Sequence, residues 1–257
     1  MTVLKTNNNI LSIKKLLSVQ VSLNGLCFLV YNKDTLELLY KNEVSFPTTY
    51  TPEETLLKIK EVLAVNADEF SDIKDVTVIH LNPLFSLVPK ELFEESNLTS
   101  YLKFNTKLFD NDYIAFDIID TQNIVVIYVP FTNINNYFFE LFGEFTYQHA
   151  SGVFIKNIFS QASDSRAKMH VNVHEKQFDI LVKENNSLRL FNSFQYSCPE
   201  DLMYYILFVA EQLQLDPNVF LLEFYGCITE DDTNFKMAYT YIRNISINSS
   251  NDYLLPV

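Results

Sequence analysis

The chain of 257 residues is acidic and rich in hydrophobic side chains. It carries a formal charge of −13, and 48% of its residues are hydrophobic and 14% aromatic, but it has only 4 glycines. Loops that hold a phosphate need several glycines, because bare backbone N–H groups must approach the ligand. The glycines are scattered, which excludes a glycine-rich phosphate loop; they are Gly25, Gly143, Gly152 and Gly226.

The distribution of charge and cysteine points to a cytoplasmic protein that binds neither nucleic acid nor membrane. The densest cationic run is Lys14-Lys15, whereas a nucleic-acid or anionic-membrane surface needs a basic stripe. Three isolated cysteines, Cys27, Cys198 and Cys227, are typical of small buried side chains in a reducing compartment. The N-terminal residues lack the apolar core of a signal peptide, and no apolar run reaches the ~20 residues of a membrane span.

The first third of the sequence predicts three strands, a helix and a buried strand. Residues 18–23 and 26–31 alternate around Asn24-Gly25, a strong hairpin signal, and 36–40 follows a turn. Thr51 and Pro52 predict a helix start, and the helix should run to about Val65. Residues 76–81 read as a buried strand of the parallel type.

The last third predicts the same order. Strands are expected at 169–173, 178–182 and 188–196, and a helix opens at Pro199 after Ser197 or Cys198. A buried strand at 219–224 and a helix at 231–243 follow, the latter capped by its acidic start. Between the two parts lie a hairpin (113–117 and 124–129), a helix at 133–142 and a strand at 145–148. The polar segment 161–166 is the predicted hinge.

The repeated order of elements predicts an α/β fold with two mixed sheets in tandem, each flanked by helices. This order resembles that of the actin-like ATPase superfamily, whose duplicated lobes are ribonuclease H-like. The segments LSVQVSLNGLCFLV (17–30) and NPLFSLVPKELF (82–93) resemble a Bacteroidota family, domain of unknown function 3822. The resemblance implies a first lobe at 13–160, with an inserted hairpin and helix, and a second at 165–257. The alternative is that the two repeats are unrelated mixed sheets.

The resemblance also implies where a nucleotide would bind. Each lobe of the superfamily has an Asp-x-Gly turn after its first strand. In the first lobe Ser22 stands at the position of the Asp and Asn24 at that of the Gly, with Gly25 one residue late. In the second lobe Asn172 replaces the Asp, and three glycine positions hold His174, Glu175 and Lys176. The adenosine-binding Gly-Gly matches Gly226-Cys227, half intact.

These replacements remove the chemistry of the superfamily. Neutral Ser22 and Asn172 lack the negative charge that Mg²⁺ seeks in its ligands. Side chains at His174, Glu175 and Lys176 would crowd a phosphate, and Glu175 would repel it. We therefore expect no catalytic residues, no metal and no cofactor, although nucleotide binding without hydrolysis stays open.

Histidines and paired carboxylates also have structural explanations. His170 and His174 lie about 13 Å apart along a strand at ~3.3 Å per residue, too far for one metal ion. His80 and His149 have no Cys or Glu companions that would suggest a site. Four acidic residues near the central hairpin could be an acid–base pair, but Asp is also a common turn residue; they are Asp110, Asp112, Asp117 and Asp120.

The aromatic residues of 137–142 cover more of a helix circumference than one buried stripe needs. They form a possible partner surface; its members are Tyr137, Phe138, Phe139 and Phe142. The sequence thus predicts a non-catalytic protein-binding or scaffold module with an unknown protein partner, possibly a homo-oligomer. The alternative function is that of an atypical nucleotide-binding protein or ATPase-like switch.

Overall fold

The computed structural model describes residues 14–104, 106–109, 111–161 and 166–248. These residues belong to two compact units, and each unit is described by itself. Unit 1 comprises Met1–Asn82 and Pro130–Gln148; unit 2 comprises Pro83–Val129 and His149–Val257. Unit 2 thus takes in residues 83–129, which the lobe division places in the first lobe. The division into lobes at 13–160 and 165–257 stays a prediction.

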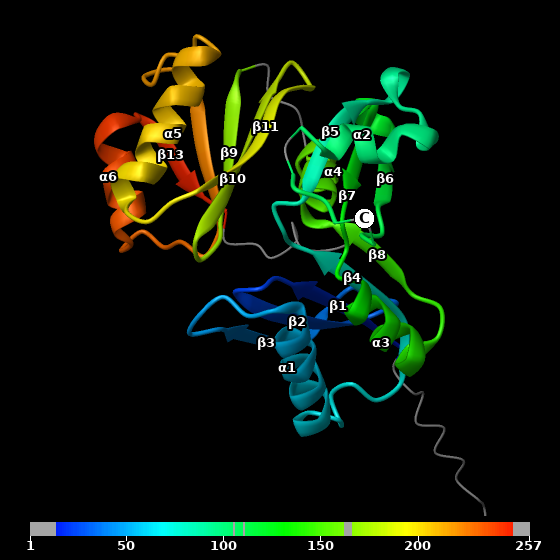
Figure 1. Cartoon of the computed structure of the whole chain (residues 1–257). Helices are drawn as coiled ribbons and strands as arrows, with labels where there is room; N and C mark the ends of the chain where they lie inside the picture. Colours follow the sequence, from blue (N-terminus) through cyan, green and yellow to red (C-terminus); the bar gives the residue numbers. More distant parts are fainter. Residues whose placement is uncertain (1–13, 105, 110, 162–165, 249–257) are drawn as a thin grey trace, which may run out of the picture. The chain divides into compact units, whose positions relative to one another are not determined.

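The first unit is built around a five-stranded sheet, here called sheet A. The strands lie in the order β3-β2-β1-β4-β8, with β1 antiparallel to β2 and parallel to β4 (Figure 1). The elements are β1 (Lys15–Val21), β2 (Gly25–Asn32), β3 (Leu38–Ser45), α1 (Pro52–Val65), β4 (Ile73–His80), α3 (Thr132–Phe142) and β8 (Thr146–His149).

The second unit contains another five-stranded sheet, sheet C, and a smaller sheet of three strands. Sheet C has the order β11-β10-β9-β12-β13, and the small sheet has the order β5-β7-β6. The elements are β5 (Phe85–Pro89), α2 (Leu98–Leu102), β6 (Ala115–Ile119), β7 (Ile124–Tyr128), α4 (Ala150–Ser160), β9 (Lys168–Val173), β10 (Gln177–Glu184), β11 (Ser187–Gln195), α5 (Pro199–Gln212), β12 (Leu221–Gly226), α6 (Thr233–Tyr241) and β13 (Asn244–Ile247).

The two large sheets repeat one topology. In sheet C, β9 is antiparallel to β10 and parallel to β12, as β1 is to β2 and β4 in sheet A. The crossover helix precedes the parallel strand in both, α1 before β4 and α5 before β12. The predicted fold class, two mixed sheets in tandem flanked by helices, is confirmed.

Each sheet buries an apolar face in a core of its own. In sheet A the alternate residues Leu17, Val19 and Val21 of β1 pack with Ile59 of α1 and Phe138 of α3. In sheet C alternate residues of β9 and β10 pack with α5 and α6; they are Met169, Val171, Val173, Phe178, Ile180 and Val182. A sheet with one face in such a core fixes its register, because a slip of one residue would expose every buried side chain.

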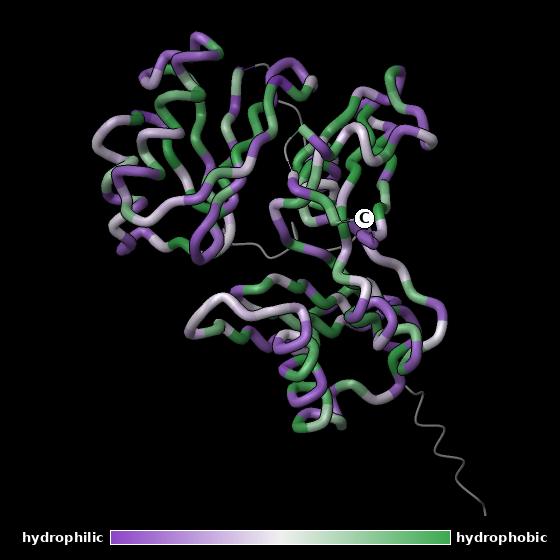
Figure 2. Tube along the Cα trace, viewed as in Figure 1, coloured by the Kyte–Doolittle hydropathy of each residue, from purple (hydrophilic) through white to green (hydrophobic). Residues whose placement is uncertain are grey.

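The predicted helix start at Thr51 is confirmed, and the turn between β10 and β11 has the residues that its geometry requires. Thr51 caps α1: its hydroxyl accepts a hydrogen bond from Glu54 N at 3.2 Å, and the Glu54 carboxylate accepts one from Thr51 N at 2.8 Å. Figure 2 shows the mixture of hydrophobic and hydrophilic residues along α1 that a half-buried helix requires. Asn185 and Asn186 have positive φ angles and turn β10 into β11, which is typical of a two-residue hairpin.

Among the described helices and strands, β5, α2, α4 and β13 have no counterpart in the sequence prediction. Helix α4 gives no amphipathic signal because eight of its eleven residues are buried. The last helix ends at Tyr241, and its expected continuation to Arg243 is replaced by the turn into β13. Most of the predicted hinge, residues 162–165, lies outside the described residues. No helix in the described part of the chain is both long and apolar enough to cross a membrane.

Candidate functional site

The β1–β2 turn is held closed by the side chain of Ser22. The Ser22 hydroxyl accepts hydrogen bonds from Asn24 N at 3.2 Å and Gly25 N at 2.9 Å. The same hydroxyl donates to Gly25 O at 2.9 Å, and Asn24 Oδ1 accepts from the hydroxyl of Thr49 at 2.8 Å. Two backbone N–H groups that could face a phosphate are therefore already bonded within the turn.

The glycine of this turn has a different role from the one expected. The two turn residues are Leu23 and Asn24, because Ser22 N donates to Gly25 O and Gly25 already pairs with Ser45 of β3. The expected Asn24-Gly25 turn is thus wrong by one residue. A Cβ at Gly25 would lie 2.7 Å from Val44 O, so the glycine is required by the close approach of β3.

In the second unit the corresponding turn joins β9 to β10 and is supported by a polar cluster. His174 Nε2 lies 3.1 Å from Asp179 Oδ2 and 3.2 Å from Asn172 Nδ2. The hydroxyl of Ser193 on β11 donates to the other carboxylate oxygen of Asp179. The chain of contacts therefore runs Asn172, His174, Asp179, Ser193.

This cluster does not have the geometry of a nucleophilic triad. In such a triad the histidine lies between the serine and the carboxylate, where it takes the serine proton. Here Asp179 lies between His174 and Ser193, so the serine proton is donated directly to a carboxylate. The cluster positions the turn: His174 N donates to Gln177 O at 2.9 Å, and the Tyr196 hydroxyl donates to His174 O at 2.9 Å.

The remaining second-lobe positions lie at the same end of sheet C. Glu175 and Lys176 are exposed at the tip of the β9–β10 turn. Gly226 ends β12, which pairs with β9, and its φ is +83°. A Cβ at Gly226 would lie 2.3 Å from Val173 O and 2.8 Å from Asn172 Oδ1. The structure thus brings Asn172, His174 and Gly226 together, with the two charged side chains beside them.

The other candidate carboxylates and histidines make structural contacts. The side chain of Asp112 accepts a hydrogen bond from Phe109 N, and Asp120 pairs with Lys90 at 2.5 Å. Asp110 lies outside the described residues. His149 caps α4 by accepting a hydrogen bond from Ser151 N at 3.2 Å. Among the described residues no group of three or more His, Cys, Asp or Glu side chains could hold a metal ion.

His80 and Asp117 are buried polar groups in different units. His80 Nε2 lies 2.9 Å from Asn135 Oδ1, and its Nδ1 accepts from Phe131 N at 3.3 Å. Asp117 accepts from His149 N at 2.8 Å and from the Tyr128 hydroxyl at 3.3 Å. Burial raises the pKa of Asp117 to about 6, and these donors and Lys156 only partly oppose it.

The four aromatic residues of the predicted partner surface are placed differently by α3. Phe138 is fully buried in the core of unit 1, so its inclusion in a contact surface is wrong: it points at the sheet. Tyr137 and Phe142 are partly buried against the same core. Phe139 is 63% exposed, and its neighbour Leu141 is 50% exposed. Phe139 and Leu141 are therefore the large apolar side chains that α3 leaves exposed for a surface.

Sequence reasoning missed a second polar cluster, on the face of sheet C opposite its core. Glu223 of β12 contacts Lys168 at 2.7 Å and His170 Nδ1 at 3.4 Å, and it accepts the hydroxyl proton of Tyr225. Burial alone would raise the pKa of Glu223, but these three donors bring it to about 2. The signal in the sequence is the alternation of polar and apolar residues in KMHVNV, the segment that forms β9. This strand is buried on both faces, so its polar residues Lys168, His170 and Asn172 lie on a buried face.

Comparisons with known proteins agree with this geometry. A structure from Bacteroides thetaiotaomicron VPI-5482, described as having an actin-like ATPase fold and unknown function, has a TM-score of 0.82. It is 23% identical, and the alignment covers 95% of each chain. A chain of the PilM–PilN type IV pilus biogenesis complex has a TM-score of 0.57 and 9% identity, over 91% of this chain and 88% of that one. No curated protein matches in sequence.

The family is shown by a model described as "Protein of unknown function (DUF3822)", which matches residues 5–245. The match spans nearly the whole chain, and the Bacteroides structure agrees with it in fold. The chain has the actin-like ATPase fold, as the order of its elements predicted. It belongs to the DUF3822 family.

Proposed function

We propose that this chain is a non-catalytic protein-binding or scaffold module of the cytoplasm, built on an actin-like fold whose nucleotide site has degenerated. The proposal is carried by the residues in the β1–β2 and β9–β10 turns, at the positions where the superfamily binds phosphate. Ser22 takes the N–H groups of Asn24 and Gly25, and in the second turn Glu175 brings a negative charge to a position where the superfamily has glycine. Both changes oppose a triphosphate and its metal ion.

The likeness to a chain of the PilM–PilN complex supports a role in protein binding. That complex is described as one of type IV pilus biogenesis, so the fold is compatible with a stable protein partner. On this chain Phe139 is the exposed member of the predicted surface, and its exposed neighbour Leu141 adds apolar area that a partner could contact. Exposed aromatic side chains are frequent anchors of protein interfaces.

Calorimetry with ATP and Mg²⁺ separates the proposal from its alternative, an atypical nucleotide-binding protein or switch. We expect no saturable heat and no phosphate release from the purified chain. Tight binding or turnover would contradict the non-catalytic reading. A matched variant, Glu175→Gly, tests whether the negative charge in the β9–β10 turn prevents ATP binding. If this variant binds ATP and the wild-type chain does not, Glu175 is the cause.

A second experiment tests the surface. The tagged chain and its Phe139→Ser variant are used to capture partners from the native host, and both are sized in solution. We expect the variant to lose the partner, or the oligomer if the partner is a second copy. Tyr204→Ser is the matched control, because Tyr204 is 61% exposed on α5 of the other unit. Unchanged capture and size with Phe139→Ser would contradict a surface on α3.

A further inference from the structure

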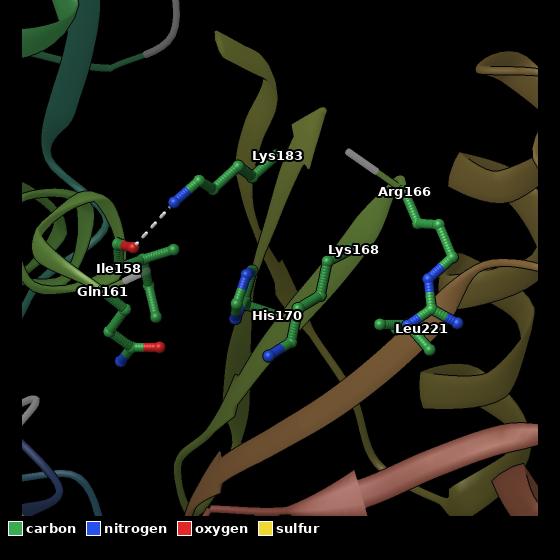
Figure 3. Close-up of a pocket in the computed structure, with 7 residues that line it drawn as sticks. All are labelled: Ile158, Gln161, Arg166, Lys168, His170, Lys183 and Leu221. Atoms are coloured by element: carbon green, nitrogen blue, oxygen red, sulfur yellow. Dashed lines mark hydrogen bonds between the residues drawn. The ribbon is translucent and has the colours of Figure 1, made fainter. Parts of the chain in front are cut away.

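A pocket lies on the face of sheet C that is opposite its apolar core. Along β9, Met169 and Val171 enter the core, so Lys168 and His170 point to the other face. Helix α4 contributes Ile158, and its C-cap Gln161 lies beside it. Figure 3 shows the seven lining residues, which are Ile158, Gln161, Arg166, Lys168, His170, Lys183 and Leu221. All belong to unit 2.

The pocket is small and basic. Its volume is about 70 Å³, roughly twice the ~30 Å³ that one water occupies in the liquid. Pockets for drug-sized ligands are larger, ~300–1,000 Å³. Three of the seven lining residues are cations and none is an acid, in a chain whose formal charge is −13. The size and charge fit one small anion.

Lys183 is the lining residue that most needs a negative partner. It is only 5% exposed, and its ammonium donates to Ile158 O at 3.2 Å and lies 4.8 Å from the Phe159 ring centre. An ammonium has three N–H donors, so two remain. Burial and the nearby charge of Lys168 lower the pKa of Lys183. In the described part of the chain no carboxylate pairs with this ammonium. A buried cation without a carboxylate is costly, and a bound anion would remove that cost.

His170 adds an acceptor to this group of donors. The ring is 2% exposed, and its Nε2 is buried without a hydrogen-bond partner among the described residues. On the other side, Nδ1 lies 3.1 Å from the Tyr225 hydroxyl oxygen and 3.4 Å from the Glu223 carboxylate. The Tyr225 proton already goes to Glu223, so the Nδ1 hydrogen is the donor in these contacts.

The protonation state of His170 follows from its surroundings. Burial lowers the pKa of His170, and the charges of Lys168 and Lys183 act in the same direction, against Glu223. The ring is therefore neutral near pH 7, with its hydrogen on Nδ1, and Nε2 carries a lone pair. A ligand that meets this pocket must offer negative oxygens to the cations and one O–H to His170.

We propose that this pocket binds hydrogen phosphate, the protonated inorganic phosphate dianion. Its oxygens accept from Lys183, and its single hydroxyl donates to His170 Nε2, while the Arg166 guanidinium lies beside Leu221 and adds positive charge at the rim (Figure 3). Lys168 is held by Glu223 at 2.7 Å and adds positive charge at the rim. The site lies at the start of β9 and the end of β10, whereas the turn at 174–176 lies at the other end of these strands. It is thus separate from the degenerate nucleotide positions and goes beyond the proposed function.

Titration of the full chain with inorganic phosphate at pH 7.5 tests the proposal, with calorimetry and thermal unfolding as readouts. We expect one saturable site and an unfolding temperature that rises with phosphate, because a ligand of the folded state stabilises it. Sulfate has the same shape but no proton to donate, and we expect it to bind at least about tenfold more weakly. Glycerol phosphate tests whether the phosphate group of an ester is accepted in place of the free ion.

Two variants locate the site, and a third controls for charge. Lys183→Met should weaken phosphate binding by at least about tenfold, the loss of one charged hydrogen bond. Arg166→Gln should weaken it too, and as an exposed residue it serves if Lys183→Met fails to fold. Lys176→Gln removes an exposed lysine at the β9–β10 turn, and we expect it to leave the affinity unchanged.

The proposal has clear contrary outcomes. Absence of saturable phosphate binding to the wild-type chain at millimolar concentration would overturn it. So would loss of binding in Lys176→Gln with full binding in Arg166→Gln, which would move the anion to the turn. Sulfate or the ester binding as tightly as phosphate would overturn the role of His170 Nε2 as an acceptor, and with it the choice of hydrogen phosphate.

Discussion

At the scale of single residues, Gly226 shows how one position constrains the pairing of two strands. It ends β12, with β9 beside it, and both its φ of +83° and the proximity of Val173 O require a glycine. The resemblance to actin-like proteins selects the same residue for a different reason, approach to an adenosine. The structure supplies a sufficient reason that involves no ligand.

Replacement of Gly226 by alanine is expected to destabilise the chain strongly. The new Cβ would lie 2.3 Å from Val173 O, so strands β9 and β12 must separate, and the positive φ adds strain. We expect the free energy of unfolding to fall by about 3 kcal/mol or more. Gly143→Ala is the matched control: φ is +75° but no atom lies within 4 Å, so the cost should be the backbone strain alone, about 1–3 kcal/mol, and smaller than at Gly226. Equal losses in urea unfolding would contradict the steric explanation.

Asp117 makes a second residue-scale prediction, which concerns pH. Its pKa is about 6 in the folded chain and near 3.8 when unperturbed, because burial disfavours the charged form. Between pH 6 and pH 3.8, Asp117 holds its proton more often in the folded chain than in the unfolded chain. The contribution of Asp117 to the free energy of unfolding therefore rises as the pH falls through this range. The cost of the buried charge is nearly complete at pH 7 and is lost as the pH falls through 6 and then below 3.8. It amounts to up to about 3 kcal/mol.

The variant Asp117→Asn should remove this pH dependence. An amide can still accept from His149 N, and the Tyr128 hydroxyl can accept from its N–H group. Relative to the variant, the wild-type chain should therefore gain stability between pH 7 and pH 4. Urea unfolding of both proteins at pH 7, 5.5 and 4.5 measures the difference. A difference that stays constant over this range would show that Asp117 does not titrate as described.

At the scale of elements, the sequence predicted those parts whose local pattern agrees with their tertiary surroundings. The capping box at Thr51 and the two-asparagine turn at 185–186 are local signals that packing leaves intact. Helix α4 and strand β13 were missed because burial on all sides of α4 and the brevity of β13 erase the periodic pattern. Lys168 was missed for a related reason, because a charged residue in a strand usually indicates an exposed face. His170 was considered only as a partner of His174 for a metal ion, and its place beside Lys168 and Lys183 depends on strand pairing.

Helix α4 also carries a glycine with no conformational need for one. Gly152 has no positive φ, and a Cβ there would meet Val126 Cγ2 at 3.5 Å, an ordinary contact. Gly152→Ala should therefore raise the free energy of unfolding by about 0.5–1 kcal/mol, since alanine favours the helix. Gly152→Val is the control: its extra methyl groups enter a packed site and should abolish the gain. A lower free energy of unfolding in Gly152→Ala would contradict this, because it would mean that the residues around Gly152 leave no room for a Cβ.

At the scale of the whole molecule, the repeat is one of topology and leaves almost no trace in residue identity. The two sheets have the same strand order, and each has a core of its own, with Ile59 of α1 and Ile206 of α5 fully buried at the crossover helices. The order of elements was predictable because each repeat keeps its hairpin, its crossover helix that begins with a proline, and its buried strand. The division of the central residues between the units was not, because the partners of β5, β6 and β7 are set by long-range pairing.

Separate cores predict that the two units unfold as separate cooperative transitions. Ile59→Ala and Ile206→Ala make the same chemical change in the two cores, and each should cost about 2–5 kcal/mol in its own unit. In scanning calorimetry we expect Ile59→Ala to lower the temperature of one transition and Ile206→Ala that of the other. The effects should add in the double variant, because distant sites in different cooperative units do not share partners. A single transition shifted equally by either variant would instead make the chain one cooperative unit, in which a partner bound at α3 would stabilise both sheets.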